Sequence, residues 1–258
     1  MEQRLVSIVS VNYKCPEITL EMLHSLAAVE YPHLEVIVVD NECGDQPFPF
    51  EAYYPEMVTV IRSEENLGFA GGTNLGIRAA SGAYILLLNN DTVVSPGFIE
   101  PMIKCLDDKP KIGMVCPKIY FFDHPNIIQY AGATLIHKWT GRGAKIGYAK
   151  KDNGDYSKSQ KTALGNGACM LVRKAVFEEV GLLSEMYFMY YEEHDFAYRA
   201  QQKGWETYYC AKASIHHRQS VSIGQESPLK IYYLHRNRML FMRRFFRGFA
   251  FIPSCFST

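Results

Sequence analysis

Two short runs of aliphatic residues limit what this chain can fold into more than any other feature. Residues 34–40 (LEVIVVD) and 84–91 (YILLLNND) are apolar almost throughout, and each run ends in polar side chains. A strand that carries apolar residues on both faces is typical of a parallel sheet with helices on either side. Residues 5–12 (LVSIVSVN) and 57–62 (MVTVIR) are also rich in β-branched residues. The sequence therefore predicts four strands in the first third of the chain.

Helical segments alternate with these strands. Pro16 suits the first turn of a helix, and the apolar residues between 18 and 27 recur at helical spacing. Residues 70–80 indicate a second helix. Strands that alternate with helices predict an α/β fold, here a Rossmann-like, mostly parallel sheet flanked by helices. The chain has 258 residues, 48% of them hydrophobic, and it lacks repeats and low-complexity linkers, so one domain is predicted.

The pattern changes after about residue 112. Strands are predicted over 112–121, 163–174 and 205–211, and helices over 174–181, 193–203 and from Pro228 onward. The stretch 132–161 is rich in glycine and polar residues, has little periodicity, and is expected to form loops or a mobile flap. A smaller subregion is therefore predicted beside the first sheet.

Charge and cysteine content exclude several classes of protein. The 27 basic and 27 acidic residues cancel, so no overall field attracts nucleic acid, and no nucleic-acid partner is expected. The N-terminus lacks the features of a signal peptide, and no window approaches the roughly 18 apolar residues of a membrane-spanning helix. The seven cysteines are scattered without a CxxC pair, which favours reduced thiols over a zinc site or disulfides. A cytoplasmic protein is expected.

Polar residues follow three of the predicted strands at their carboxyl ends. Asp40 ends the second strand, residues 66–74 (NLGFAGGTN) follow the third, and Asn89-Asn90-Asp91 ends the fourth. A single aspartate at a strand end is often only a helix cap or a turn former. Three such features at one sheet edge, where doubly wound proteins bind ligands, favour a binding site. The oxygen-rich Asn89–Asp91 segment suits Mg²⁺ or Mn²⁺.

The glycine-rich segment 66–74 does not match the common nucleotide-binding motifs. It is not GxGxxG, and no lysine follows its glycines as a phosphate-binding P-loop requires. Its glycines are still compatible with a backbone that closely approaches a ligand, and with a helix whose N-terminus faces anionic oxygens.

Residues 187–200 (YFMYYEEHDFAYRA) combine carboxylates with aromatic side chains. Apolar surroundings and like charges both raise a carboxyl pKa, which is how a general base is tuned. The alternative is a helix start, with Asp195 paired to Arg199 one turn later, and this is favoured for Asp195 and for one of Glu192 and Glu193. His216-His217 follow the last predicted strand, where a histidine is either structural or a metal ligand.

Taken together, these motifs resemble family-2 glycosyltransferases, most closely the rhamnosyltransferase-like branch. The resemblance covers roughly residues 5–245, and NLGFAGG followed by NNDT is its most specific part; GNGACMLVRKAVFEEVGLL, YFMYYEEHDFAYRAQQKGW and YYLHRNRMLF continue it. It implies the nucleotide-sugar-binding GT-A fold. It also implies a nucleotide-sugar-binding half over 1–118, an acceptor-binding and catalytic half over 119–225, and a basic-aromatic helix over 226–258.

The resemblance implies a role for each motif. Asp40 would contact the uracil or thymine of the donor, and Asp91 would hold Mg²⁺ or Mn²⁺ on the diphosphate with His216 as the downstream ligand, although His217 is an open alternative. Glu193 would be the catalytic base in an inverting transfer from dTDP-rhamnose or a UDP-sugar to a saccharide or lipid-linked acceptor of cell-surface polysaccharide synthesis. The donor site would comprise Asn12, Asp40, Asn66, Gly68, Phe69, Gly71, Asn74, Asn89 and Asn90, and the acceptor side Gly167, Glu192 and Asp195.

Two departures from the family pattern support a competing interpretation. Asn89 stands at the first position of the family's Asp-x-Asp motif, and Glu193 stands where the family has an aspartate base. A catalytically inactive, glycosyltransferase-like binding protein is the alternative that these changes favour. A nucleotidyltransferase would show a glycine-rich basic loop after the first strand, but residues 12–16 (NYKCP) contain one lysine and no glycine.

The C-terminal segment interleaves arginine with apolar residues. RNRMLFMRRFFRGFAFIP (236–253) fits a packed helix with solvated arginines. It equally fits an interfacial segment at an anionic membrane surface, which would place the protein peripherally at the inner face of the cell membrane.

Overall fold

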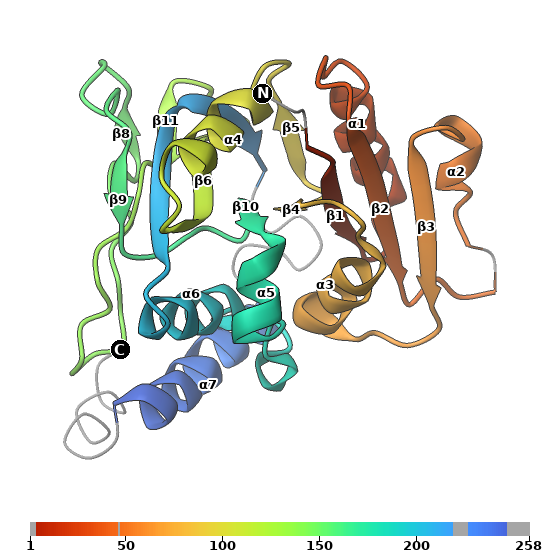
Figure 1. The fold of residues 1–258 in the computed structure, drawn as a ribbon. Helices are drawn as coiled ribbons and strands as arrows, with labels where there is room; N and C mark the ends of the chain where they lie inside the picture. The colour runs from red at the N-terminus through yellow and green to blue at the C-terminus, as the bar shows by residue number, and fades with distance from the viewer. Residues whose placement is uncertain (1–3, 46, 219–226, 247–258) are drawn as a thin grey trace.

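The computed structural model describes residues 4–45, 47–218 and 227–246, and their fold is a mixed α/β arrangement around one large sheet (Figure 1). The predicted N-terminal parallel sheet is confirmed. Its four strands pair in parallel in the order β3-β2-β1-β4. Their bounds are β1 (Val6–Asn12), β2 (Leu34–Asn41), β3 (Val58–Ser63) and β4 (Tyr84–Leu88).

The C-terminal half extends the same sheet with strands of both directions. β4 pairs antiparallel with β10, which pairs antiparallel with β6, and β11 then lies parallel to β6 and antiparallel to β5. Shorter strands continue from β6 and β11. Their bounds are β5 (Thr92–Val94), β6 (Ile112–Phe121), β7 (Ile127–Tyr130), β8 (Lys150–Lys151), β9 (Gln160–Thr162), β10 (Cys169–Arg173) and β11 (Glu206–His217).

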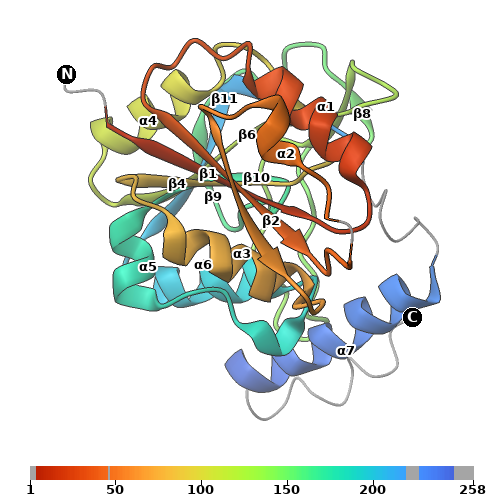
Figure 2. The same ribbon diagram turned by 90° about the vertical axis from the view of Figure 1, so that its right-hand side faces the viewer.

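Helices cover both faces of the sheet. In Figure 2, α1 and α4 lie on one side of the sheet, and α3, α5 and α6 lie on the other, with α7 packed beyond α6. The burial of the strands on both faces explains why their sequences lack polar alternation. The helices are α1 (Pro16–Leu26), α2 (Phe50–Tyr53), α3 (Gly68–Ala79), α4 (Ile99–Asp108), α5 (Lys174–Val180), α6 (Glu192–Gln202) and α7 (Pro228–Phe245), with a short 3₁₀ helix η1 (Glu185–Tyr187).

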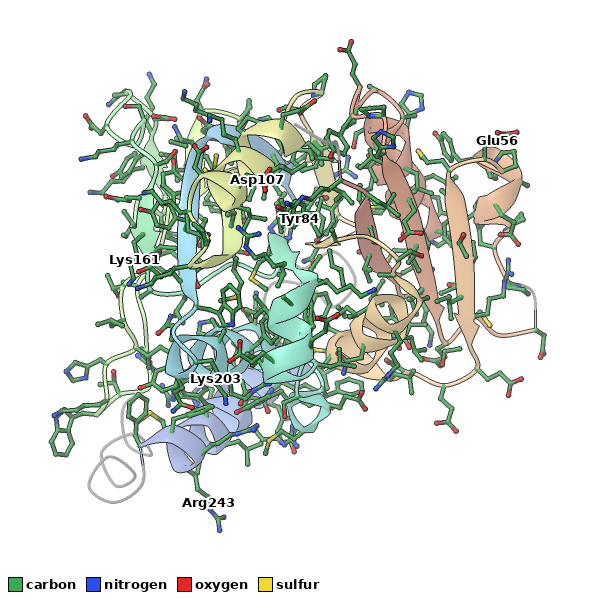
Figure 3. All side chains as sticks on the ribbon, viewed as in Figure 1. Glu56, Tyr84, Asp107, Lys161, Lys203 and Arg243 are labelled. Carbon is green, nitrogen blue, oxygen red and sulfur yellow. The ribbon has the colours of Figure 1, made fainter. Side chains whose placement is uncertain are left out.

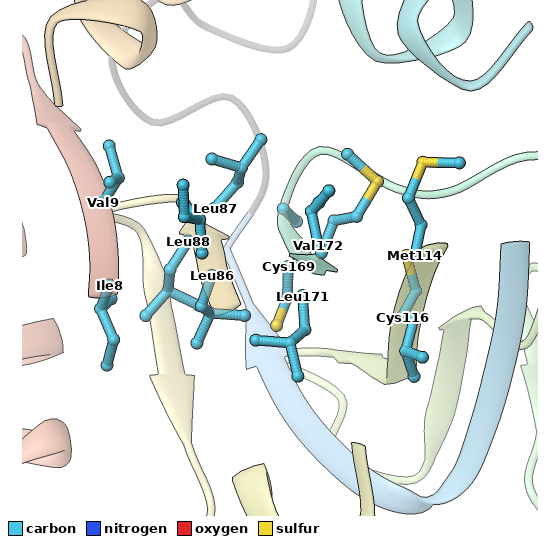
Figure 4. Packing of buried hydrophobic residues seen from close by; sticks show 14 of the residues in the cluster. Ile8, Val9, Leu86, Leu87, Leu88, Met114, Cys116, Cys169, Leu171 and Val172 are labelled. Atoms are coloured by element: carbon cyan, nitrogen blue, oxygen red, sulfur yellow. The ribbon is translucent and has the colours of Figure 1, made fainter. Parts of the chain in front are cut away.

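The core is continuous across the two halves. Leu86 of β4 lies between Ile8 of β1 and Leu171 of β10, and all three side chains are almost completely buried (Figure 4). Burial of a side chain of this size is worth roughly 1.5–3 kcal/mol. At the surface edge of the core, the Tyr84 hydroxyl donates a hydrogen bond to Asp107 of α4 (Figure 3). The sheet therefore holds the two halves together as one packed unit.

Three sequence predictions differ from the structure at element boundaries. The strand predicted over 205–211 extends to His217, because a register shift between Cys210 and Ser214 lets β11 continue along β6. The strand predicted over 163–174 is confined to Cys169–Arg173. Part of the stretch 132–161, expected to be loop, forms the short strands β8 and β9.

Helix α3 lies unusually close to the sheet. A Cβ on Gly76 would come within 2.3 Å of Val9 Cγ1, and one on Gly72 would come within 3.0 Å of Val11 Cγ1. These glycines are therefore used for packing α3 onto β1. This close packing sets the start of α3 beside the carboxyl ends of β1 and β2.

Candidate active site

One cavity of about 260 Å³ lies at the carboxyl ends of β1, β2 and β4. Its walls come from these strand ends, the start of α3, the turn before β10, the start of α6 and the end of β11. Nine of the predicted site residues line it: Asn66, Gly68, Phe69, Asn89, Asn90, Asp91, Gly167, Glu192 and Glu193. Six others lie outside its lining: Asn12, Asp40, Gly71, Asn74, Asp195 and His216.

The segment after β4 is held in place by its backbone. The Asn89 N–H donates to the Ala168 carbonyl at 3.0 Å, and the Arg218 N–H donates to the Asp91 carbonyl at 3.0 Å. Asn89 Oδ1 is buried and has no hydrogen-bond partner among the described residues. A fixed backbone thus presents a carboxylate and an unsatisfied amide oxygen to the cavity.

His217 lies directly beside this carboxylate. Its Nε2 is 3.0 Å from Asp91 Oδ1, and its Nδ1 is 2.7 Å from Gln129 Oε1. If Nδ1 carries the proton that Gln129 accepts, the Nε2 lone pair faces Asp91, as in a metal-ligating histidine oriented by a carbonyl-type partner. Gln129 is completely buried and was not predicted from the sequence, because it lies 88 residues away along the chain.

The role of His216 as a metal ligand stays a prediction, but the structure places His216 outside the cavity lining. Adjacent residues in a strand point to opposite faces, and only one of the two histidines can face the cavity. The His216 ring stacks on Tyr120 with ring centroids 5.6 Å apart, and burial lowers the pKa of His216. His217 is the histidine that lines the cavity.

The residues present fit a hard divalent cation bound together with substrate oxygens. Asp91, His217 and the amide oxygen of Asn89 supply donors of the right chemistry. Within the described ranges, no group of three or more His, Cys, Asp or Glu residues could enclose a metal ion. A cation here would therefore complete its coordination with diphosphate oxygens or water.

Asp40 and Asn12 form a buried support behind the cavity. Asn12 Nδ2 donates to Asp40 Oδ1 at 2.7 Å, Thr19 Oγ1 donates to Asn12 Oδ1 at 2.8 Å, and Asn90 Nδ2 donates to Thr19 Oγ1 at 3.0 Å. Asp40 is only 4% exposed and lies outside the cavity lining, and its contact with the donor base stays a prediction. The neighbouring Asn41 lines the cavity instead.

Backbone N–H groups at the start of α3 donate hydrogen bonds to other groups of the protein. The Leu67 N–H donates to Asn41 Oδ1, the Gly68 N–H to Asn66 Oδ1, and the Ala70 N–H to the Phe188 carbonyl. These bonds occupy three of the amides at the start of the helix, and the anion contact expected at this helix N-terminus stays a prediction.

Three predicted residues near this helix have structural roles. Gly68 has φ +68°, and any Cβ there would collide with the Phe188 backbone. Gly71 packs against Leu67, and Asn74 exchanges hydrogen bonds with the Leu183 backbone.

Glu192 and Glu193 face the same cavity from the first turn of α6. Burial raises the pKa of Glu192, and the charge of Glu193 raises it further. Burial also acts to raise the pKa of Glu193, but His194, 3.2 Å away, and a hydrogen bond with Glu192 outweigh it, so the pKa of Glu193 is lowered. Within the pair, the pKa of Glu192 therefore lies above that of Glu193, and Glu193 loses its proton first. Gly167 lies on the same wall, and a Cβ atom built on it would be 3.9 Å from the Glu193 side chain.

The favoured interpretation of Asp195 is confirmed. Its carboxylate is completely buried and pairs with Arg199 at 2.6 Å, one turn along α6, and with Arg244 of α7 at 2.9 Å. Tyr187 also donates to it. Asp195 thus joins two helices and does not face the cavity.

Two cationic side chains in the cavity wall were not predicted. Lys145 comes from the loop before β8, and Lys230 comes from the first turn of α7. Their positions could not be found from local sequence patterns, because the loop and the helix reach the cavity only through tertiary packing.

The cavity, with a carboxylate–histidine pair and a second carboxylate pair, lies at the carboxyl edge of a Rossmann-like sheet, where α/β proteins bind their ligands. The comparison with protein families agrees. Residues 7–181 match the family Glycosyl transferase family 2, and the chain belongs to this family.

Relatives named as sugar transferases match almost the whole chain. The low-salt glycan biosynthesis hexosyltransferase Agl10 of Haloferax volcanii is 28% identical over 91% of this chain and 74% of its own length. The N-acetylglucosaminyl-diphospho-decaprenol L-rhamnosyltransferase of Mycobacterium tuberculosis is 24% identical over 92% of this chain and 84% of its own length. The predicted similarity to rhamnosyltransferase-like members of the family is therefore confirmed.

Solved structures confirm the fold. The structure of GalNAc-T7 with UDP, GalNAc and Mn²⁺ has a TM-score of 0.72 and 15% identity over 92% of this chain. The chain spans 48% of that protein's length. The mannosyltransferase PcManGT of Pyrobaculum calidifontis, in complex with GDP-Man and Mn²⁺, has a TM-score of 0.68 and 16% identity, and the match covers 98% of this chain and 67% of that one. The GT-A fold predicted from the sequence is thus the fold observed.

Proposed function

We propose that this chain is a metal-dependent, inverting glycosyltransferase that moves a sugar from a nucleoside diphosphate sugar to a hydroxyl group of a saccharide or lipid-linked acceptor. The observation that carries the proposal is the placement of Asp91 and His217 in one small cavity with the ionised Glu193. A cation-binding pair and a candidate base thus share a space in which a donor and an acceptor can meet. The Mn²⁺-containing structural relatives support the cation, either Mn²⁺ or Mg²⁺.

The chemistry follows from these positions. Glu193 takes the proton of the acceptor hydroxyl as its oxygen forms a bond to the anomeric carbon. The bond between that carbon and the donor diphosphate breaks, and the nucleoside diphosphate leaves from the opposite face, which inverts the anomeric centre. A cation held at Asp91 and His217 would offset the charge on the departing diphosphate. The cavity walls orient the two substrates and exclude water.

The donor is proposed to be dTDP-rhamnose or a UDP-sugar, and the product to belong to cell-surface polysaccharide. The relatives from H. volcanii and M. tuberculosis, named as a hexosyltransferase and a rhamnosyltransferase, support a hexosyl or rhamnosyl donor. We also propose that residues 1–118 bind the donor and residues 119–225 bind the acceptor. Donor-side residues such as Asn66 and acceptor-side residues such as Gly167 line the same cavity, which supports this division.

Peripheral membrane contact by the C-terminal segment remains a prediction. Helix α7 exposes apolar side chains, including Ile231 at 54% and Tyr232 at 58%, which supports an interfacial role. Residues 247–258 of the proposed segment lie outside the described residues. In the described part of the chain, no helix is both long and apolar enough to cross a membrane. Peripheral placement at the cytoplasmic face would suit a lipid-linked acceptor.

The first experiment is calorimetric titration with dTDP, UDP and GDP, in Mn²⁺ and in chelator. The proposal expects metal-dependent binding of dTDP or UDP that is lost in Asp91→Ala. The matched control is Asp108→Ala, which removes a half-exposed carboxylate on α4 that pairs with Lys104 at the surface. Absence of nucleotide binding by folded protein would refute the donor site.

A turnover assay distinguishes the proposed transferase from a catalytically inactive binding protein. Incubation with the donor that binds, followed by measurement of released nucleoside diphosphate with and without candidate acceptors, tests it directly. Binding without release would favour the inactive alternative. Release that disappears in Glu193→Gln, with nucleotide binding retained, would support the transferase.

A further inference from the structure

The segment between η1 and α6 carries an unusual amount of backbone strain. Phe188, Tyr190 and Tyr191 have φ angles of 65°, 64° and 75°, in the left-handed region that bulky side chains rarely occupy. This segment leads directly into the first turn of α6, which carries Glu193. Such strain persists only where the surrounding structure fixes the backbone.

One side chain of α7 holds this strained segment. Asn237 Nδ2 lies 2.7 Å from the Tyr187 carbonyl, 2.7 Å from the Met189 carbonyl and 2.9 Å from the Tyr190 carbonyl. Asn237 is completely buried. The two hydrogens of its amide group are therefore shared among three backbone acceptors that have turned toward one point.

A neighbouring arginine fixes the orientation of that amide. Arg236 Nη1 donates to Asn237 Oδ1 at 3.0 Å, and Arg236 Nη2 donates to the Met186 carbonyl at 3.0 Å. The amide oxygen is thereby assigned to the arginine, and the amide nitrogen must face the strained turn. Asn237 and Arg236 together fix the backbone of residues 186–190.

The strained turn contributes to the cavity wall and also contacts the start of α3. Met189 and Tyr190 line the cavity itself, and the Phe188 carbonyl accepts from the Ala70 N–H at the start of α3. A shift of this turn would therefore move the entry to α6, and with it the carboxylate of Glu193. The Asp91–His217 pair lies on other elements, after β4 and at the end of β11.

From these contacts we infer that Asn237 is a positioning residue for the reaction: it holds the strained turn 187–191 so that Glu193 meets the acceptor hydroxyl in the correct place. The inference rests on the proposed transferase function. A positioning error near 1 Å can reduce a rate about 100-fold. Loss of the Asn237 amide is therefore expected to lower kcat about 10- to 100-fold and to leave nucleotide affinity within about threefold.

The test compares Asn237→Ala with Arg243→Ala. Arg243 lies on the same helix, and its exposed side chain points away from the rest of the protein (Figure 3). kcat and KM come from release of nucleoside diphosphate, and nucleotide Kd and stoichiometry come from calorimetry. The inference expects a lower kcat in Asn237→Ala with unchanged binding stoichiometry, and wild-type values in Arg243→Ala. Unchanged kcat, or a loss of binding sites in proportion to the loss of activity, would overturn it.

Two further measurements keep the inference falsifiable. If Asn237→Ala does not fold, Arg236→Met tests the inference in its place. This variant removes both arginine hydrogen bonds and keeps most of the aliphatic stem. A kcat equal to that of wild type would then refute the inference. Chymotrypsin, which cleaves after aromatic residues, reports on the turn without any need for transferase activity. Faster cleavage at Tyr190 or Tyr191 in Asn237→Ala would support the role of Asn237 in fixing the turn. If wild type at the same time showed no turnover, the proposed function alone would be rejected.

Discussion

The division of labour between Glu192 and Glu193 gives the sharpest test of the site. Burial and the adjacent charge raise the pKa of Glu192, whereas His194 and a hydrogen bond lower that of Glu193. A raised pKa favours the protonated form of Glu192, and glutamine is a close mimic of that form. Glu192→Gln should therefore keep kcat within about threefold.

The same pair predicts a large loss in the other variant. Glu193→Gln removes the proton acceptor, and general base catalysis typically contributes 10²- to 10⁴-fold, or about 2.7–5.5 kcal/mol of barrier at about 1.36 kcal/mol per decade. Glu193→Asp retains the charge but withdraws the carboxylate by about 1.5 Å, one carbon–carbon bond. A loss of about 100-fold is expected for it.

The assay is release of nucleoside diphosphate under saturating donor and acceptor, with calorimetry as the binding control for each variant. Nucleotide Kd should stay within about threefold of wild type in all three variants, because neither glutamate belongs to the Asp91–His217 pair. Equal losses in Glu192→Gln and Glu193→Gln would refute the assignment of a single base. So would a Glu193→Gln enzyme that retains full activity.

Three further predictions concern the metal site, the sheet and pH. His217→Ala should weaken Mn²⁺-dependent nucleotide binding about 10- to 100-fold in calorimetry, whereas His216→Ala should leave it nearly unchanged, and the reverse order would contradict the geometry. Gly76→Ala places a methyl group 2.3 Å from a β1 side chain and should lower the free energy of unfolding in urea by about 1–3 kcal/mol. Hydrogen bonds from Lys118 and Tyr120 lower the pKa of Asp152 from 3.8 to about 2, so its stabilising effect is complete above pH 4 and is lost as the pH falls toward 2. The stability difference between wild type and Asp152→Asn in thermal melts should shrink across that interval, and a difference independent of pH would refute the linkage.

The sequence predicted the parts of the fold that depend on local pattern. Uninterrupted apolar runs such as 84–88 can be stable only with both faces covered, and so they indicated the parallel sheet before any contact was known. The Asp195–Arg199 pair was also predictable, because helical spacing fixes the distance between residues four positions apart. The carboxyl-edge site followed from the rule that parallel strands end at one edge.

Other features depended on contacts between distant segments. Strand alternation establishes that His216 and His217 face opposite ways, but only the pairing of β11 with β5 and β6 decides which one meets Asp91. The hydrogen bond that Asn12 donates to the buried Asp40 was likewise not predicted from the sequence. No local signal reports such a partner, because it arises from the register of neighbouring strands.

By itself, then, the sequence determined the α/β class, the family and the edge of the sheet at which the ligand site lies, since these follow from periodicity and from motifs within short windows. The tertiary structure alone decided which histidine joins Asp91, which glutamate has the raised pKa, and which side chain of α7, Asn237, bonds to the turn before Glu193. Those outcomes depend on burial and on hydrogen bonds between residues tens of positions apart, and burial and long-range contact exist only once the chain has folded.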